Sequence, residues 1–131
     1  MGASVATIVL REGLILVARR NLEGPMGGRW EFPGGKMEEG EGESDAVERE
    51  FREEFDARIR PARRIGQTSF SHRGIERTLY GWLAELPRGE RLVLKEHLEY
   101  RWVRLGELES LEMADSDRKL IPFIEGYLAG T

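Results

Sequence analysis

The feature that most constrains the fold is an apolar stripe in the segment SDAVEREFREEF, residues 44–55. Val47, Phe51 and Phe55 recur every four residues, and this spacing places them on one face of an α-helix. A serine and several acidic residues stand at the start of the segment, where helices commonly begin. The segment therefore predicts an amphipathic helix whose apolar face packs against another layer of structure.

The residues before this helix are typical of a β-hairpin followed by a loop. SVATIVL and LILVARR are rich in β-branched and apolar residues, and REG separates them. NLEGPMGGRW comes next, and its glycines and proline predict a loop.

The residues after the helix predict three more strands and a final helix. RIRPARRIGQTSFSH and IERTLYGWLAEL are expected to pair around a turn, and YRWVRL is expected to form a short strand. Residues 116–128 predict an amphipathic helix, although a proline and a glycine lie inside it. Strands before and after a central helix, with a second helix at the end, predict an α/β fold with a mixed sheet covered on both faces.

Composition limits the number of domains and the kinds of site. A chain of 131 residues with 40% hydrophobic and 34% charged residues is typical of one globular domain, here residues 1–131. The chain has no cysteine, which excludes disulfides and thiolate chemistry, and only two histidines, His72 and His97. No apolar run is long enough to span a bilayer, and no secretory or myristoylation signal is visible. We therefore expect a cytoplasmic protein without a membrane partner.

The helical segment and its upstream flank are unusually acidic. From Lys36 to Asp56 there are ten acidic and three basic residues, a net charge of −7, whereas the whole chain carries −4. Glu50, Glu53 and Glu54 stand at i, i+3 and i+4, so their carboxylates lie within one arc. Mg²⁺ or Mn²⁺ prefers such oxygen ligands and would remove the repulsion between them. A solvated acidic helix face with arginine pairs is the alternative that charge and spacing leave open.

The double glycine before the helix offers main-chain atoms to such a site. Pro33 stiffens the chain, whereas Gly34 and Gly35 permit unusual backbone angles and a close approach of the main chain. A carbonyl or an amide at this point could reach a metal ion or a phosphate.

The spacing of these residues resembles the Nudix box. That motif has a glycine, five residues, a glutamate, seven residues, and then Arg-Glu-hydrophobic-any-Glu-Glu-any-Gly-hydrophobic. The matching positions are Gly35, Glu41, Arg49, Glu50, Phe51, Arg52, Glu53, Glu54, Phe55, Asp56 and Ala57. Asp56 alone departs, because the family has glycine there. Aspartate tolerates left-handed backbone geometry, so we expect the helix end to persist.

The resemblance extends to ILVARR, GRWEFPGGK and RWVRLGEL, which are similar to the MutT-like branch, and so covers most of the chain. It implies a Nudix fold, an α/β/α sandwich with a mixed β-sheet. The implied activity is the hydrolysis of nucleoside diphosphate derivatives. For the MutT-like branch, nucleoside triphosphate and water would give nucleoside monophosphate and pyrophosphate.

The resemblance also implies roles for individual residues. Glu50, Glu53 and Glu54 match the family's catalytic, metal-binding glutamates, and the carbonyl of Gly35 matches a further ligand. The expected cofactor is Mg²⁺, with Mn²⁺ able to substitute. Arg49 matches an arginine that orients the glutamates. Glu41 matches a residue that supports the site or binds the metal more weakly.

The group that accepts the proton of the attacking water stays open among several carboxylates and a histidine. The box glutamates are one possibility. Glu96, in KEHLEYRW, best matches the acidic position of MutT-like enzymes as a ligand or base, and Glu99 is close behind. His97 could serve instead, although a surface histidine is the simpler interpretation. His72 is expected to be a turn residue.

Substrate-binding residues also follow from the resemblance. Arg20 and Phe32 fall where MutT-like enzymes line the nucleoside pocket, although a surface charge and a core residue are the alternatives. Lys36 is a further candidate for binding the substrate. Asp117 best matches the position that reads the base, with Asp115 less favoured, and either could instead cap a helix. An ionised aspartate accepts hydrogen bonds from cytosine or oxidised guanine, so we expect 8-oxo-dGTP or (d)CTP-type substrates.

Other functions use the same motif. Hydrolysis of ADP-ribose, a dinucleoside polyphosphate or capped RNA needs the same box, and a nucleotide-sensing domain without catalysis usually lacks box glutamates. RNA binding through Arg58, Arg60, Arg63 and Arg64 is less favoured, because their alternation is typical of a solvated edge strand. We expect a small-molecule nucleotide as the partner and no nucleic-acid partner. Both a monomer and a homodimer fit the sequence.

Overall fold

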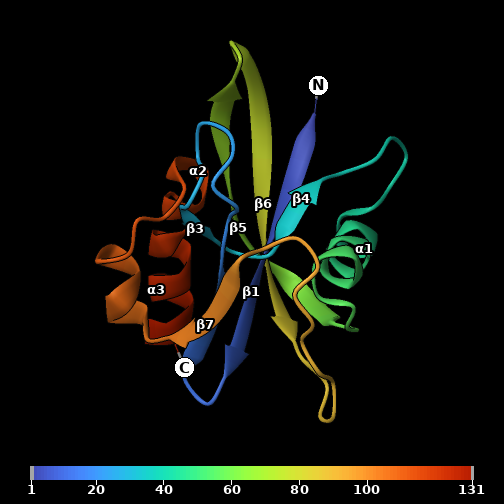
Figure 1. Ribbon diagram of the computed structural model, residues 1–131, viewed down its shortest axis with the longest axis vertical. Coiled ribbons are helices and arrows are strands. Elements are labelled where there is room, and N and C mark those ends of the chain that lie inside the picture. The colour runs from blue at the N-terminus through green and yellow to red at the C-terminus, as the bar shows by residue number, and fades with distance from the viewer. Residues whose placement is uncertain (1, 131) are drawn as a thin grey trace.

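The computed structural model describes residues 2–130 and places a mixed β-sheet between two helical layers (Figure 1). Its elements are β1 (Ala3–Arg11), β2 (Leu14–Arg19), β3 (Trp30–Glu31), β4 (Gly34–Lys36), α1 (Glu43–Phe55), β5 (Arg60–His72), β6 (Ile75–Glu85), β7 (Glu99–Val103), the 3₁₀-helix η1 (Leu105–Glu109), α2 (Asp115–Arg118) and α3 (Ile121–Ala129). The strand order is β3-β2-β1-β6-β5, with β4 paired to β1 and β7 paired to β2. Because β1 runs parallel to β6 and antiparallel to β2 and β4, the predicted mixed sheet is confirmed.

Strand β1 is central because its side chains enter both cores. Successive residues of a strand point to opposite faces. Val5 and Val9 therefore join the core under α1, whereas Ala6 and Ile8 join the core under α3. The two layers lie on opposite sides of the sheet, as Figure 1 shows, so the expected α/β/α arrangement is confirmed.

Helix α1 forms as the apolar stripe predicts. Val47, Phe51 and Phe55 are buried against the sheet, and the rings of Phe51 and Phe55 lie 4.9 Å apart between centroids. The helix ends at Asp56, which adopts the left-handed conformation with φ 51° and ψ 41°. Its N–H donates to the carbonyl of Arg52 (2.9 Å), so the aspartate terminates the helix where the family has glycine.

The single C-terminal helix expected over residues 116–128 is wrong. The chain forms α2 and α3 instead, with Lys119 and Leu120 between them. Pro122 stands in the first turn of α3, where its missing N–H would have had no helical partner. The apolar side chain of Ile124 packs α3 against the sheet. Among residues 2–130, no helix has both the length and the apolar character that crossing a membrane would require.

The loop before β7 is fixed to α1 and β2 by main-chain hydrogen bonds. The N–H groups of Val93 and Lys95 donate to the carbonyls of Phe55 and Glu54, at 2.9 and 3.1 Å. The N–H of Leu98 donates to the carbonyl of Arg19 in β2 (3.0 Å). These bonds hold the two residues between Lys95 and Leu98 beside the C-terminal end of α1.

Candidate active site

A cavity of about 410 Å³ lies where α1, β4, α2 and the loop before β7 meet. Most of the site residues that the sequence predicted line this cavity. Those that line it are Arg20, Phe32, Gly35, Lys36, Glu50, Glu54, Glu96 and Asp117. Glu53, the remaining member of the predicted set, does not line it; its side chain is 49% exposed and pairs with Arg49.

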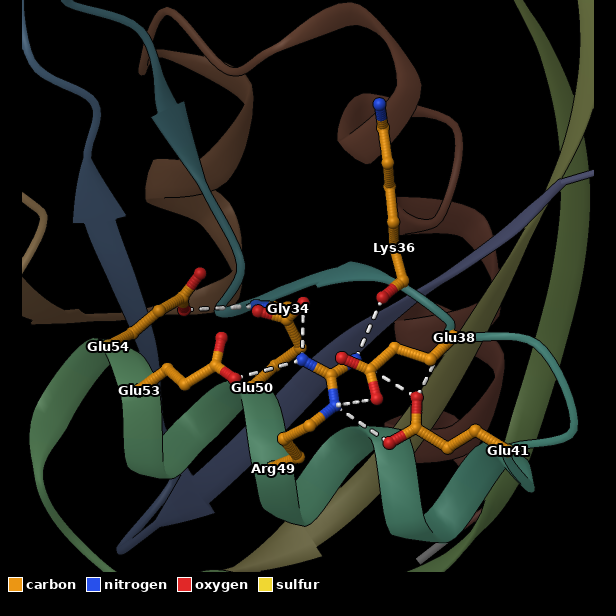
Figure 2. Close-up of polar contacts among 8 residues, drawn as sticks. All are labelled: Gly34, Lys36, Glu38, Glu41, Arg49, Glu50, Glu53 and Glu54. Atoms are coloured by element: carbon orange, nitrogen blue, oxygen red, sulfur yellow. Dashed lines mark hydrogen bonds and ion pairs between the residues drawn. The ribbon is translucent and has the colours of Figure 1, made fainter.

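The double glycine lets the backbone of β4 lie directly against its neighbours. Gly34 has φ +154°, and a Cβ atom there would overlap the carbonyl oxygen of Val5 in β1. A Cβ atom on Gly35 would overlap the carboxylate of Glu50. The N–H of Gly34 donates to Oε1 of Glu54 (3.1 Å), as Figure 2 shows. Glycine at both positions is therefore what brings α1's carboxylates against the main chain.

Arg49 holds the carboxylates of the motif together, as the resemblance implied (Figure 2). Its Nε donates to Glu41 (2.7 Å) and its Nη1 donates to Glu53 (3.1 Å) and Glu50 (3.4 Å). Its Nη2 donates to the carbonyl of Lys36 (2.9 Å) and to Glu41 (2.9 Å). These bonds raise the pKa of Arg49 and lower that of Glu41. The side chain of Lys36 extends away from the glutamates.

The surroundings of Glu54 and Glu50 disfavour the ionised form of each carboxyl group. Glu54 is 4% exposed, and burial raises the pKa of its carboxyl well above the usual value, with the charge of Glu31 adding to the effect. Burial also raises the pKa of Glu50, against the opposing attraction of Arg49, while Glu53 and Glu96 raise it further. A divalent cation would remove this repulsion. Carboxylates beside the main chain of Gly35 form an oxygen-rich set that fits Mg²⁺ or Mn²⁺.

His97 is not the surface histidine that the sequence suggested. Its side chain is 4% exposed, and its ring stacks on Phe55 with 5.8 Å between centroids and 13° between planes. Its Nε2 lies 2.8 Å from Oε2 of Glu31. The correction has a physical reason: the main-chain bonds of the loop turn this residue inward, over the last turn of α1.

Glu31 is the site residue that sequence reasoning missed. Its Oε1 accepts a hydrogen bond from Nη1 of Arg20 (3.0 Å), while Oε2 faces His97. The carboxylate therefore lies between Arg20 and His97, which both line the cavity. The available signal was its place in WEFP, between two aromatic residues: Trp30 and Phe32 point into one core, so Glu31 must point to the other face.

Asp117 lines the cavity and is 7% exposed. The N–H of Phe32 donates to its Oδ2 (2.8 Å), and the hydroxyl of Ser116 donates to Oδ1 (3.2 Å). Burial, and then the charge of Glu31, raises the pKa of Asp117 to about 7. Neither Asp115 nor Asp117 caps α2, because the N-cap residue of this helix is Ala114.

Three other expectations about the cavity can be compared with the geometry. Phe32 fits both interpretations, since its side chain belongs to the core under α3 and the residue also lines the cavity. Asp115 is exposed, pairs with Arg29 at 3.4 Å and does not line the cavity. Arg20 lines the cavity and pairs with Glu31, so it is more than a surface charge at the strand end.

Several weaker candidates lie outside the cavity. Glu99 of β7 pairs with Arg19 of β2 (3.4 Å) and with Arg101 of its own strand (3.5 Å). His72 is exposed at the end of β5, next to the turn, as expected. The arginines of the basic cluster contact acidic or aromatic partners, in the pairs Arg58–Glu90, Arg60–Glu85, Arg64–Glu43 and Arg63–Tyr127. Within residues 2–130, strand β5 pairs only with β6, which confirms the expected edge strand.

Comparison with known proteins agrees with this geometry. The NUDIX domain model matches residues 1–124. A CTP pyrophosphohydrolase of Escherichia coli (strain K12) is 33% identical over 129 residues, covering 95% of this chain and 90% of the relative. A putative 8-oxo-dGTP diphosphatase 2 of Mycobacterium tuberculosis is 32% identical over 130 residues, covering 97% and 90%. The crystal structure of a MutT protein from Methanosarcina mazei Go1 matches with a TM-score of 0.82 and 25% identity, covering 96% and 94%. The chain therefore belongs to the Nudix family and is a hydrolase of phosphoric anhydride bonds.

Proposed function

We propose that this Nudix hydrolase is a Mg²⁺-dependent nucleoside triphosphate pyrophosphohydrolase of the cytoplasm, which releases nucleoside monophosphate and pyrophosphate. The observation that carries the proposal is the cavity itself. In its lining, Glu54 and Glu50 lie against Gly34 and Gly35 of β4, whereas Asp117 and Arg20 contact Phe32 and Glu31 earlier in the chain. A substrate with a polyphosphate at one end and a base at the other fits this division. The similar proteins named for CTP and 8-oxo-dGTP support the same class of substrate.

The residues proposed to hold Mg²⁺ are Glu50, Glu54 and the carbonyl of Gly35, with Glu53 at the rim and Glu96 from the facing loop. When bound, Mg²⁺ or Mn²⁺ neutralises charge on the polyphosphate and lowers the pKa of the attacking water. Arg49 keeps the carboxylates in position through its hydrogen bonds to Glu50 and Glu53. Lys36 extends from β4 and is proposed to bind phosphate oxygens, because its ammonium makes no ion pair among residues 2–130.

We assign proton acceptance to Glu96, with a box glutamate and His97 as the alternatives. Glu96 lines the cavity, and no hydrogen bond or ion pair engages its carboxylate within the described part of the chain. Glu54, by contrast, already accepts a hydrogen bond from Gly34 and is buried. A base needs a lone pair within reach of the water, and Glu96 is the carboxylate whose oxygens are least engaged.

We propose 8-oxo-dGTP or (d)CTP-type nucleotides as substrates. Oδ2 of Asp117 accepts from the N–H of Phe32 and Oδ1 accepts from the hydroxyl of Ser116, so a base would meet a lone pair that these bonds leave on Oδ1. An ionised carboxylate there accepts from the N4 amine of cytosine, or from the N1–H and N2–H groups of 8-oxoguanine. Thymine presents O4 at the position of the cytosine amine, so it is disfavoured at this contact.

The test is a product analysis with Mg²⁺ and a substrate panel of 8-oxo-dGTP, dCTP, 5-methyl-dCTP, dTTP, ADP-ribose and a dinucleoside tetraphosphate. We expect nucleoside monophosphate and pyrophosphate from the first three, and loss of both products in Glu53→Gln. A preference for dTTP would contradict the substrate assignment. Hydrolysis of ADP-ribose or the dinucleotide alone would contradict the triphosphate proposal and leave the family assignment standing.

A further inference from the structure

The cavity contains a group of potential ligands that differs from the all-oxygen set of the motif. Glu31 of β3, Glu54 of α1 and His97 of the loop before β7 each offer one ligand atom, and these atoms all lie within 4.8 Å of one another. We propose that Glu31, Glu54 and His97 form a second cation site, which takes Zn²⁺ or a similar transition-metal ion.

The donor set determines the kind of ion. Mg²⁺ takes oxygen ligands, whereas an imidazole nitrogen suits Zn²⁺, Co²⁺ and Ni²⁺. One histidine nitrogen and two carboxylate oxygens leave a fourth position for water, which is a common arrangement for Zn²⁺ with three protein ligands. The Glu31–Glu54–His97 site would therefore select against Mg²⁺, even though it lies in the same cavity.

The three side chains are already oriented by neighbouring groups. Arg20 donates to Oε1 of Glu31 (3.0 Å), and the N–H of Gly34 donates to Oε1 of Glu54 (3.1 Å). Each carboxylate is thus held through one oxygen and presents the other. Bonds of this kind, made to the ligands by residues that do not touch the metal, increase metal affinity.

The imidazole of His97 is buried and held with one nitrogen toward the carboxylates. The side chain of His97 is 4% exposed, and its Nδ1 has no hydrogen-bond partner among residues 2–130. Its ring orientation is set by stacking on Phe55 and by the contact of Nε2 with Glu31. Nε2 is therefore the nitrogen that faces the carboxylate of Glu31, and it is the ligand atom that a cation at this site would use.

Because Glu54 belongs to both sets, an ion at this site would compete for a proposed Mg²⁺ ligand. Zn²⁺ should then inhibit the Mg²⁺-dependent reaction, and additional Mg²⁺ should relieve the inhibition. This consequence rests on the proposed function, whereas the binding of Zn²⁺ does not.

The experiment is a titration of the ¹⁵N-labelled protein with ZnCl₂, in which the imidazole nitrogens are observed by NMR. The chain has only two histidines, so the spectrum holds two rings, and His72→Asn identifies them. His72 is exposed and outside the cavity, which makes this variant the matched control. One equivalent of Zn²⁺ is expected to move one nitrogen of His97 to the shift of a coordinated imidazole, whereas excess Mg²⁺ should not.

Calorimetric Zn²⁺ titrations of variants test the ligand set. His97→Phe keeps an aromatic ring against Phe55 and loses the nitrogen, and Glu31→Gln keeps the shape of the side chain. Each should weaken Zn²⁺ binding by about tenfold or more. His72→Asn should bind as the parent does, and Glu50→Gln should keep the His97 shift. Circular dichroism melts establish that each variant is folded.

The proposal would be overturned if Zn²⁺ bound while the nitrogens of His97 did not move, since the ion would then sit on carboxylates alone. It would also be overturned if folded His97→Phe bound Zn²⁺ as tightly as the parent, or if the parent bound no Zn²⁺. Hydrolysis with Mg²⁺ alone tests the proposed function separately, so failure of one leaves the other distinguishable.

Discussion

Glu54 serves the site through both its side chain and its main chain. Its carboxylate lies in the cavity and accepts from Gly34, while its carbonyl accepts from Lys95 and so helps to fix the loop that carries Glu96 and His97. One residue therefore sets the distance between the helix carboxylates and the facing loop. This coupling makes Glu54 the most informative single position in the motif.

We expect Glu54→Gln to lower kcat by about 100-fold or more, since even residues that only orient metal ligands contribute roughly 10–100-fold. The same variant should unfold at a higher temperature in EDTA, because the raised pKa of Glu54 means that its ionised form is disfavoured in the folded state. Activity assays and thermal melts measure the two effects. Glu39→Gln, an exposed position outside the cavity, is the control. A Glu54→Gln protein that is active, or less stable in EDTA, would contradict this account.

Asp117 gives a pH prediction. Its pKa rises from 3.8 to about 7 on folding, so between these values the folded state holds a proton that the unfolded state has lost. Its contribution to stability therefore falls as pH rises, by up to about 1.4 kcal/mol per pH unit. Asp117→Asn retains an acceptor for the N–H of Phe32 without a charge.

Urea unfolding of the parent chain and of Asp117→Asn at pH 5, 6, 7 and 8 measures this effect. The difference in free energy of unfolding between the two proteins is taken at each pH. Asp117→Asn should gain stability over the parent as pH rises to about 7, and the gain should level off above it. Asp115→Asn, at an exposed residue, should show no such trend. A difference that is constant across this range would show that Asp117 is ionised throughout.

At this scale the sequence could predict the carboxylates of α1, because their spacing is local. It could not predict the Glu31–His97 contact, which joins residues 66 positions apart. That contact depends on how β3 and the loop before β7 are brought together by the pairing of β2 with both strands β3 and β7. Local periodicity contains no information about this pairing.

At the scale of elements, α1 was predictable because helix propensity and the apolar stripe agree over its whole length. The C-terminal region was not, because the pattern over residues 116–128 is helical on both sides of the break. The break matters for the site. It leaves Asp117 on the short helix α2, where it reaches the N–H of Phe32, while α3 packs its apolar side chains against the sheet.

The end of α1 gives a prediction at this scale. Asp56 holds φ at 51°, a conformation that glycine adopts without strain and alanine adopts at about 1–2 kcal/mol. Asp56→Gly should therefore raise the free energy of unfolding by several tenths of a kcal/mol, whereas Asp56→Ala should lower it by about 1 kcal/mol. Urea denaturation of the two variants measures the order. Equal stability of the parent and Asp56→Ala would contradict the role of the left-handed cap.

For the molecule as a whole, the sheet separates two cores, and the cavity is where the two helical layers contribute to one site. Glu50 and Glu54 come from the α1 layer, and Asp117 comes from the α2 and α3 layer. A ligand that contacts Glu50 or Glu54 together with Asp117 therefore joins the two helical layers, which are otherwise connected by the sheet. Such a ligand binds the folded state and not the unfolded chain, so it must stabilise the whole fold.

We expect Mg²⁺ alone to raise Tm, because it relieves the repulsion between Glu50 and Glu54, which burial intensifies. A non-hydrolysable nucleoside triphosphate analogue with Mg²⁺ should raise it further. At a ligand concentration of 100 times Kd, the added stability is about 2.7 kcal/mol. Differential scanning calorimetry with EDTA, with Mg²⁺, and with Mg²⁺ and the analogue measures the series.

Two variants distinguish the Tm response to Mg²⁺ from the Tm response to the nucleotide analogue. Glu50→Gln with Glu54→Gln should abolish the response to Mg²⁺ alone, because the carboxylates that repel one another are gone. Asp117→Asn should keep the Mg²⁺ response and change only the increment that the analogue adds, because its side chain bonds to the N–H of Phe32 and not to the helix carboxylates. If the double variant responded to Mg²⁺ as the parent does, the ion would bind elsewhere, and Glu50 and Glu54 would not be its ligands.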